Sequence, residues 1–187
     1  YREALKLIIE GYDMDKEIQS EIRNQIEESD TKFYAAFQIS NQFEAIKFGM
    51  LITLSDKLID RFKHDFSEIT PADRWGEKER ELIFHINKSF SIRTGFDERF
   101  NKFFIGVFKD TKHNNKHENI IVAALSEKYT KSNKCKNSGW IFLFYPKELQ
   151  DWNNNPTLWT GIKNDSTTNM ISELLGNVNS IIHTHLQ

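Results

Sequence analysis

The sequence predicts an α+β fold with N-terminal helices, a small antiparallel sheet and a C-terminal amphipathic helix packed on the sheet. Apolar residues recur every three or four positions in the first third of the chain, and this period shortens to two beyond Lys88. A strong apolar helical face returns over Asp165–Ile182, behind capping side chains at Asp165–Thr168. We expect a helical region over residues 1–70 and the sheet with its C-terminal helix over residues 71–187, as one compact unit.

Two helices are predicted between Asp15 and Phe62. The first lies between Asp15 and Ser29, because isoleucines recur every four residues on one face, at Ile18, Ile22 and Ile26. A longer helix starts near Asp30, with Asp30 or Thr31 as its cap. Bulky aromatic residues favour a core-facing stripe over a coiled coil. That stripe comprises Phe33, Phe37, Phe43, Ile46, Met50, Leu54, Leu58 and Phe62.

Four strands are predicted in the second half of the chain. The residues from Ala72 to about Ile86, after the breaker Thr70-Pro71, fit either a short helix or the lead-in to a strand. Apolar residues then alternate with polar ones from Phe90 to Phe96, as in a half-buried strand. The loops between strands are too short for crossover helices, so the sheet should be antiparallel. The further strands are expected over residues 102–108, 119–125 and 140–145.

Two tryptophans follow the last predicted strand. Six apolar or aromatic residues over 140–145 predict a strand packed on both faces, which Pro146 ends. The turn-forming residues 151–156 come next, flanked by Trp152 and Trp159. We interpret both rings as caps on the edge of the core, because an indole buries a large apolar area and keeps one polar N–H. A stacking platform for an unpaired base is the alternative.

Composition bounds the class of protein. With 187 residues, 39% hydrophobic and 28% charged, and three prolines, the chain is globular rather than disordered. The single cysteine, Cys135, excludes a disulfide framework and a thiolate zinc cluster, and favours a reducing, cytoplasmic compartment. No apolar run is long enough to cross a bilayer, so no membrane partner is expected. The chain opens at Tyr1 in an apolar pattern without a capping residue, which we interpret as a piece of a longer protein.

Lysines concentrate in the second half of the chain. Residues 1–100 carry a net charge of −5 and residues 101–187 a net charge of +3, and nine lysines between Lys102 and Lys147 face three acidic residues. Such a patch attracts a phosphate backbone weakly and without sequence preference. All nine are lysines, so the bidentate fork of arginine is missing, and ordinary solvated loops are the alternative. The candidate DNA contacts are Lys112, Lys116, Lys131, Lys134 and Lys136.

No motif nominates a catalytic residue or a metal ligand. His113 and His117 have the spacing of two zinc ligands on a helix, but they stand in a polar segment without a third ligand. No glycine-rich phosphate loop, no G-x-S-x-G and no Cys–His pair is present. We therefore expect no cofactor in this chain, and whether the chain is an enzyme stays open.

The tryptophan-containing tail and the order of elements carry one resemblance. With Trp140, Trp152 and Trp159, this region resembles the C-terminal part of bacterial proteins of the PD-(D/E)XK nuclease superfamily. Such nucleases hold Mg²⁺ on acidic residues and use the lysine of a D/E-x-K strand to support the attacking water. No predicted strand here contains that pair, and the variant Glu148-x-Gln150 follows Pro146.

The resemblance therefore implies an accessory, DNA-facing region of a nuclease-like protein, without a catalytic motif of its own. Mg²⁺ would bind only in a nuclease core preceding Tyr1, and these 187 residues alone should not cleave DNA. The alternative is a protein-interaction or oligomerisation module with no enzymatic role, in which the helices over residues 15–62 bury a protein partner or a second copy.

Overall fold

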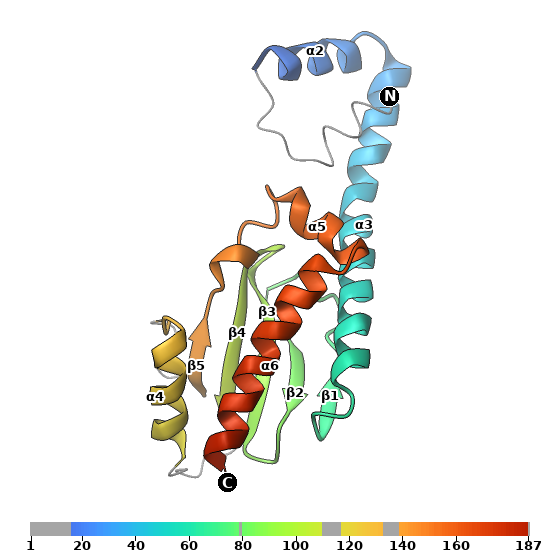
Figure 1. The fold of residues 1–187 in the computed structure, drawn as a ribbon. Helices are drawn as coiled ribbons and strands as arrows, with labels where there is room; N and C mark the ends of the chain where they lie inside the picture. The colour runs from blue at the N-terminus through green and yellow to red at the C-terminus, as the bar shows by residue number, and fades with distance from the viewer. Residues whose placement is uncertain (1–15, 79, 110–116, 133–138, 187) are drawn as a thin grey trace.

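The computed structural model describes residues 16–78, 80–109, 117–132 and 139–186. These residues form helices and a five-stranded sheet, which confirms the α+β class (Figure 1). The helices are α2 (Lys16–Glu27), α3 (Asp30–Phe62), α4 (Glu118–Lys128), α5 (Pro156–Lys163) and α6 (Ser166–Leu186), with a 3-10 helix, η2 (Lys147–Leu149). The strands are β1 (Glu68–Thr70), β2 (Leu82–His85), β3 (Phe90–Glu98), β4 (Asn101–Lys109) and β5 (Trp140–Phe144).

The sheet is an antiparallel meander in the order β1-β2-β3-β4-β5, which confirms the predicted antiparallel orientation, although the connection from β4 to β5 is long and contains α4. Its centre is the hairpin of β3 and β4, whose pairing runs from Phe90 opposite Lys109 to Glu98 opposite Asn101. A register shift at Val107 and Phe108 marks the pairing of β4 with β5. The two longest strands therefore form the platform on which the helices pack.

Helices cover one face of this sheet. Figure 1 shows α6 crossing that face, with the second half of α3 on the β1 side and α4 on the β5 side. The core lies between them and is formed by large apolar side chains with no exposed surface, among them Leu51, Leu54, Leu58, Phe90, Ile92, Phe96, Phe103, Ile105, Ile171 and Leu175. Burial of this size is the main stabilising contribution to such a fold.

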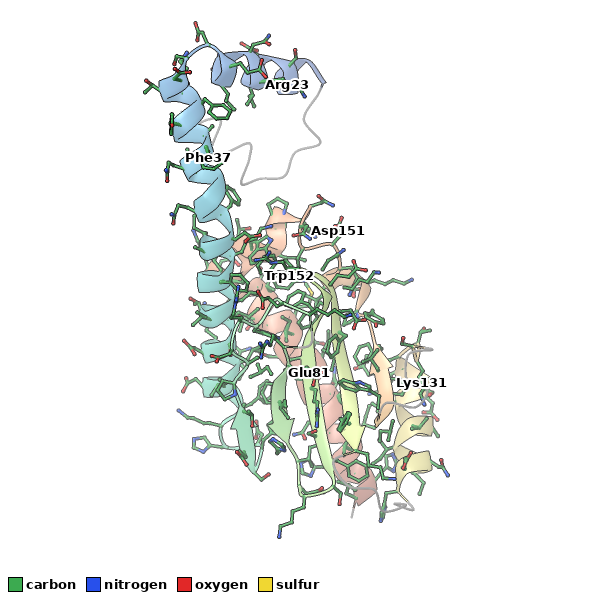
Figure 2. The ribbon with its side chains drawn as sticks, turned by 180° about the vertical axis from the view of Figure 1, so that it is seen from behind. Arg23, Phe37, Glu81, Lys131, Asp151 and Trp152 are labelled. Carbon is green, nitrogen blue, oxygen red and sulfur yellow. The ribbon has the colours of Figure 1, made fainter. Side chains whose placement is uncertain are left out.

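The opposite face carries no helix among the described residues and is covered by its own side chains (Figure 2). Arg93 lies 3.6 Å from the ring centroid of Phe108 and pairs with Glu81 at 3.3 Å. The ring of Trp140 packs over Gly106, where an added Cβ would stand 2.5 Å from the indole. Glycine is required there because the indole occupies the space of a side chain.

Two sequence predictions about local structure are wrong. Residues 119–125, predicted as a strand, lie in α4, which buries Ile121 and Leu125 one turn apart. The segment is helical because its apolar side chains pack at four-residue spacing, which a strand would turn to opposite faces. The cap of α3 is Ser29 rather than Asp30 or Thr31, because its hydroxyl accepts the Lys32 N–H at 3.3 Å.

The start of α6 also differs from its predicted capping. The amide oxygen of Asn164 accepts the Ser166 N–H at 3.1 Å, so this cap comes from one residue earlier than predicted. The carboxylate of Asp165 instead binds Lys57, and the Thr167 hydroxyl donates to the Leu158 carbonyl at 2.8 Å. Residues 72–86 contain β2 and form no helix among the described positions, so the lead-in to a strand was the right alternative.

The tryptophans close one end of the core, as predicted. Trp152 is fully buried and donates to the Leu149 carbonyl at 2.9 Å, and Trp159 donates to the Trp152 carbonyl at 2.6 Å. A stacking platform requires an exposed ring face, whereas Trp152 is 0% and Trp159 8% exposed, so the caps on the core are the interpretation that fits. Trp140 is only half-buried, so the strand over 140–145 is packed on both faces from Ile141 onwards and not at its first residue.

Candidate functional site

Only one of the five lysines predicted to contact DNA lies among the described residues. Lys131 is exposed beside β5, and the next residue, Ser132, donates its N–H to the Leu143 carbonyl at 2.7 Å (Figure 2). Lys112, Lys116, Lys134 and Lys136 lie outside the described residues. The structure therefore leaves their clustering as a prediction.

A polar pocket of about 370 Å³ lies next to Lys131 and is lined by Lys102, Ser132, Tyr145 and Gln150. Its groups are engaged in holding the chain together. Lys102 pairs with Glu98, and the Tyr145 hydroxyl donates to the Asp97 carboxylate. The Gln150 amide donates to the carbonyls of Phe103 and Pro146, both at 2.8 Å. We interpret these contacts as structural.

The histidine and carboxylate patterns that were considered in the sequence do not come together among the described residues. His117 lies 2.7 Å from the His185 carbonyl through Nδ1 and so joins the start of α4 to α6, while His113 lies outside. Glu148 is exposed on η2. Asp110-x-Lys112, which follows β4 in the sequence, also has the acidic-x-Lys spacing, and this pair lies outside the described residues. Within the described ranges, no group of three His, Cys, Asp or Glu side chains could hold a metal.

The first half of α3, residues 30–47, stands beyond the sheet, with α2 at its far end (Figure 1). Its apolar side chains are largely exposed: Phe33 55%, Tyr34 67%, Phe37 53% and Ile46 55%. The prediction that the whole stripe faces the core is therefore wrong. The reason is length: 33 helical residues extend about 50 Å, whereas the nine-residue strands extend about 30 Å.

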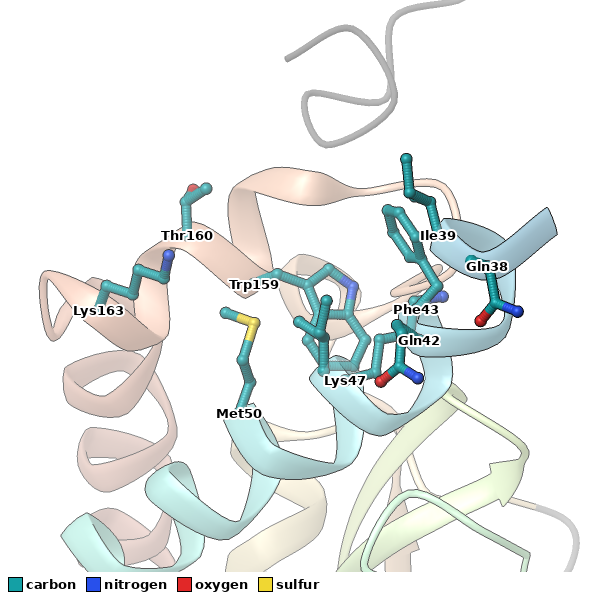
Figure 3. A pocket seen from close by; sticks show the side chains of 10 residues that line it. Gln38, Ile39, Gln42, Phe43, Lys47, Met50, Trp159, Thr160 and Lys163 are labelled. Carbon is teal, nitrogen blue, oxygen red and sulfur yellow. The ribbon is translucent and has the colours of Figure 1, made fainter. Parts of the chain in front are cut away.

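An apolar groove of about 380 Å³ lies between this part of α3 and α5 (Figure 3). Its lining residues are Gln38, Ile39, Gln42, Phe43, Ile46, Lys47, Met50, Trp159, Thr160 and Lys163. Ile39, Phe43, Ile46 and Met50 recur at steps of four, three and four residues, so they share one side of α3. The groove is thus a strip of one helix face with a second helix as its wall.

The sequence around α5 sets the position of that wall. Pro156 occupies the first turn of α5, where its missing N–H costs nothing. The Trp159 ring meets Phe100 edge-on at 5.8 Å, in addition to its bond to the Trp152 carbonyl. Gly161 lies against Thr167, whose hydroxyl would stand 2.2 Å from an added Cβ. The indole is therefore held firmly at the floor of the groove, with Thr160 and Lys163 at its edge.

Lys47 is the charged group at the floor of the groove. Its Nζ lies 5.3 Å from the ring centroid of Phe100 and 5.5 Å from that of Trp159, and it donates to the amide oxygen of Asn153 at 3.2 Å. Burial lowers the pKa of Lys47; Glu44 opposes this shift and Arg99 adds to it. The groove lining holds two lysines and no carboxylate. A partner that binds in the groove must therefore present a mainly apolar surface, and it must leave both lysine ammonium groups in contact with water or with an acidic group.

This groove between α3 and α5 was not predicted from the sequence. The signal available was a second apolar line on the long helix, Ile39 and Ile46, about 150° from the line of Phe33 and Phe37 at 3.6 residues per turn.

No family model, curated protein or solved structure matches this chain. Among the described helices, none combines the length and the apolar character that crossing a membrane requires.

Proposed function

We propose that the chain is a protein-interaction module without a catalytic role of its own, and that the first half of α3 with its groove is the binding surface. The observation that supports this most is the groove itself, an apolar strip of helix beside Trp159 that no described side chain fills. Grooves between helices that present apolar side chains at three- and four-residue steps accept a further helix.

The exposure of the helix supports the same function. Apolar side chains stand on two nearly opposite sides of the first half of α3, a pattern typical of a helix with neighbours on both sides. A single helix in water is only marginally stable without such packing. Phe33, Tyr34, Phe37 and Ile46 together expose roughly 400 Å² if a side chain of this class offers about 150–250 Å². Exposed apolar side chains gathered on one segment often mark an interaction site, and here they are divided between two sides of α3.

Site-specific photo-crosslinking in cells that express the chain tests this function. A benzophenone amino acid at Gln42, on the edge of the groove, should give covalent protein adducts, whose masses identify the partner. The same group at Ile120, which is 49% exposed on α4, is the control and should give none. Adducts at neither position, or equal adducts at both, would contradict the proposal.

A second function, DNA-backbone contact by a nuclease-accessory region, is favoured by one observation. Lys128 and Lys131 are both exposed near β5, at the edge of the lysine-rich segments. In this proposal Lys112, Lys116, Lys131, Lys134 and Lys136 contact phosphates, and any Mg²⁺ belongs to a catalytic core outside this chain. Lysines acting as point charges give weak, sequence-independent and steeply salt-dependent binding.

Charge reversal tests that second function. Lys131, Lys134 and Lys136 changed to Glu should abolish binding to a duplex at low salt, because each lost phosphate contact lowers affinity. The control changes Lys32, Lys63 and Lys88 to Glu; these lysines are exposed on α3, at its end and at the turn before β3. Equal losses from both triple variants, or no binding by the parent chain, would exclude a dedicated lysine surface.

A further inference from the structure

We propose that the occupant of the groove is an acidic amphipathic helix of another protein, with its apolar side chains on the strip of α3 and a carboxylate on the ammonium group of Lys47. This inference rests on the proposed interaction function and names the chemistry of the partner. It is drawn from charge complementarity. The described residues that line the groove include two lysines, Lys47 and Lys163, and no acidic residue. Neither lysine has a carboxylate partner in the described part of the chain.

Lys47 differs in this respect from the other two lysines of α3. Lys32 and Lys57 each pair with a carboxylate of the same chain. The acidic neighbour of Lys47 on the helix is Glu44, and this carboxylate binds Arg99 at 2.7 Å instead. A carboxylate of a partner can therefore pair with Lys47 without breaking an ion pair within the chain.

The apolar surroundings of Lys47 make such a carboxylate necessary. Its Nζ lies 5.3 Å and 5.5 Å from the ring centroids of Phe100 and Trp159, and burial already lowers its pKa. A helix that covers the groove removes further water from this ammonium group, which is costly unless an opposite charge replaces the water. A neutral apolar helix should therefore bind poorly, whereas a carboxylate would compensate the ammonium group and raise the pKa of Lys47.

One end of the groove is closed, which limits the length of the occupant. Directly beyond the groove, Lys57 joins the α5–α6 connection to α3 through the Ile162 carbonyl and the Asp165 carboxylate, both at 2.6 Å. At the other end, the first half of α3 stands clear of the sheet (Figure 1). The occupant therefore enters from the Ile39 end and terminates beside Met50, after about 16 Å or three helical turns. A helix of this length does not have to pass the α5–α6 connection.

The contact is small, so charge rather than area must select the partner. Ten residues line the groove, compared with about 20–30 per side in a standard interface of about 800 Å² per partner, and so correspond to about 300 Å². We expect weak binding, with a Kd in the micromolar range. Apolar steps of three and four residues are common to many helices. Lys47 on α3 and Lys163 on α5 reach the groove from both of its helices (Figure 3), and electrostatic complementarity to them favours an acidic helix.

Two labelled synthetic peptides test the charge of the partner. Both form about three helical turns, with leucines at alternating three- and four-residue steps, and the flanking positions hold glutamate in one and glutamine in the other. In fluorescence anisotropy with the full chain, the glutamate peptide should bind at least tenfold more tightly, because only a carboxylate compensates the ammonium group of Lys47. Equal affinities, or tighter binding of the glutamine peptide, overturn the inference.

Lys47→Met tests whether this lysine is the source of the preference. The variant keeps an apolar side chain of similar length and removes the charge, so the tenfold preference should disappear, while the glutamine peptide should bind at least as well as before. Lys63→Met is the matched control, because Lys63 pairs with Asp60 at the far end of α3, and it should leave the preference unchanged. A preference that survives Lys47→Met, or that Lys63→Met also removes, overturns the inference.

Ile46→Glu tests whether the peptide lies in the groove. It should abolish binding, whereas Ile52→Glu should not, since Ile52 is 60% exposed on another side of α3. Equal effects of the two variants overturn the inference. Binding of neither peptide by the parent chain, as when a second copy or the residues before Lys16 fill the groove, also overturns it. Photo-adducts at Gln42 with a protein that presents no acidic helix would overturn it too, while leaving the interaction function standing.

Discussion

The two halves of α3 have the same kind of sequence and opposite surroundings. In the second half, residues 48–62, Leu51, Leu54 and Leu58 are completely buried against the sheet and α6. In the first half, Phe33 and Phe37 are more than half exposed. An apolar stripe thus specifies a helix with one face that favours burial. The length of the sheet determines how much of that face is buried within the same chain.

The largest expected difference between the halves lies in truncation of an apolar side chain. Leu54→Ala should lower the free energy of unfolding by about 3 kcal/mol, through lost transfer energy and the cavity left behind. Phe37→Ala should change it by less than about 0.5 kcal/mol, because the ring is already largely in water. Urea unfolding of both variants measures the two values. Similar losses would show that the first half is packed within the single chain.

A smaller difference is expected from the lysines that hold each half. Lys57 donates to the Ile162 carbonyl and to the Asp165 carboxylate, both at 2.6 Å, and so joins α3 to the α5–α6 connection. Lys57→Met should cost about 1 kcal/mol, since the ion pair is partly exposed but one bond reaches a part-buried carbonyl. Lys32, paired with Glu28 on the exposed first half, provides the comparison, and Lys32→Met should cost clearly less, because solvent screens an exposed ion pair.

The smallest expected effect concerns the pH dependence of Lys47. Burial lowers the pKa of Lys47 below the ordinary 10.5, so the unfolded chain binds the proton more tightly. Stability should therefore rise with pH through the folded pKa and level off near 10.5. Lys47→Met should lack this rise, which denaturant unfolding at a series of alkaline pH values can measure as the difference between the two proteins. A carboxylate supplied by a partner would reverse the sign, because it would raise the pKa.

The sequence predicted elements best where the pattern was local and one-sided. Ile22 and Ile26 lie in α2 as expected, and the two rings at 152 and 159 close the core. The strand predicted from Phe90 to Phe96 is present as β3, but it is buried on both faces rather than half-buried. It failed over residues 119–125, because a short apolar run fits a strand and a helix equally well. The choice between them came from packing: Ile121 and Leu125 are buried one helical turn apart, a match that depends on residues distant in the chain.

The candidate site was less accessible to sequence reasoning than the fold. The five lysines predicted to contact DNA were chosen because net charge can be counted in a sequence. Of these five, only Lys131 lies among the described residues. The groove was not predicted because its second side comes from α5, where Trp159 lies more than a hundred residues after Phe43. The three- and four-residue spacing of the apolar side chains on α3 was present in the sequence. Whether that side of the helix is buried or exposed depends on which elements pack against it.

The sequence by itself determined the α+β class, the antiparallel orientation of the strands and the position of the long and the last helices, since periodicity and the tight turn between β3 and β4 are local properties. Only the tertiary structure decided that Phe33 and Ile46 are exposed, that residues 119–125 are helical and that α5 forms a groove with α3. The physical reason is that burial depends on what lies opposite a side chain. A helix of about 50 Å beside strands of about 30 Å must leave part of its apolar surface uncovered by the sheet.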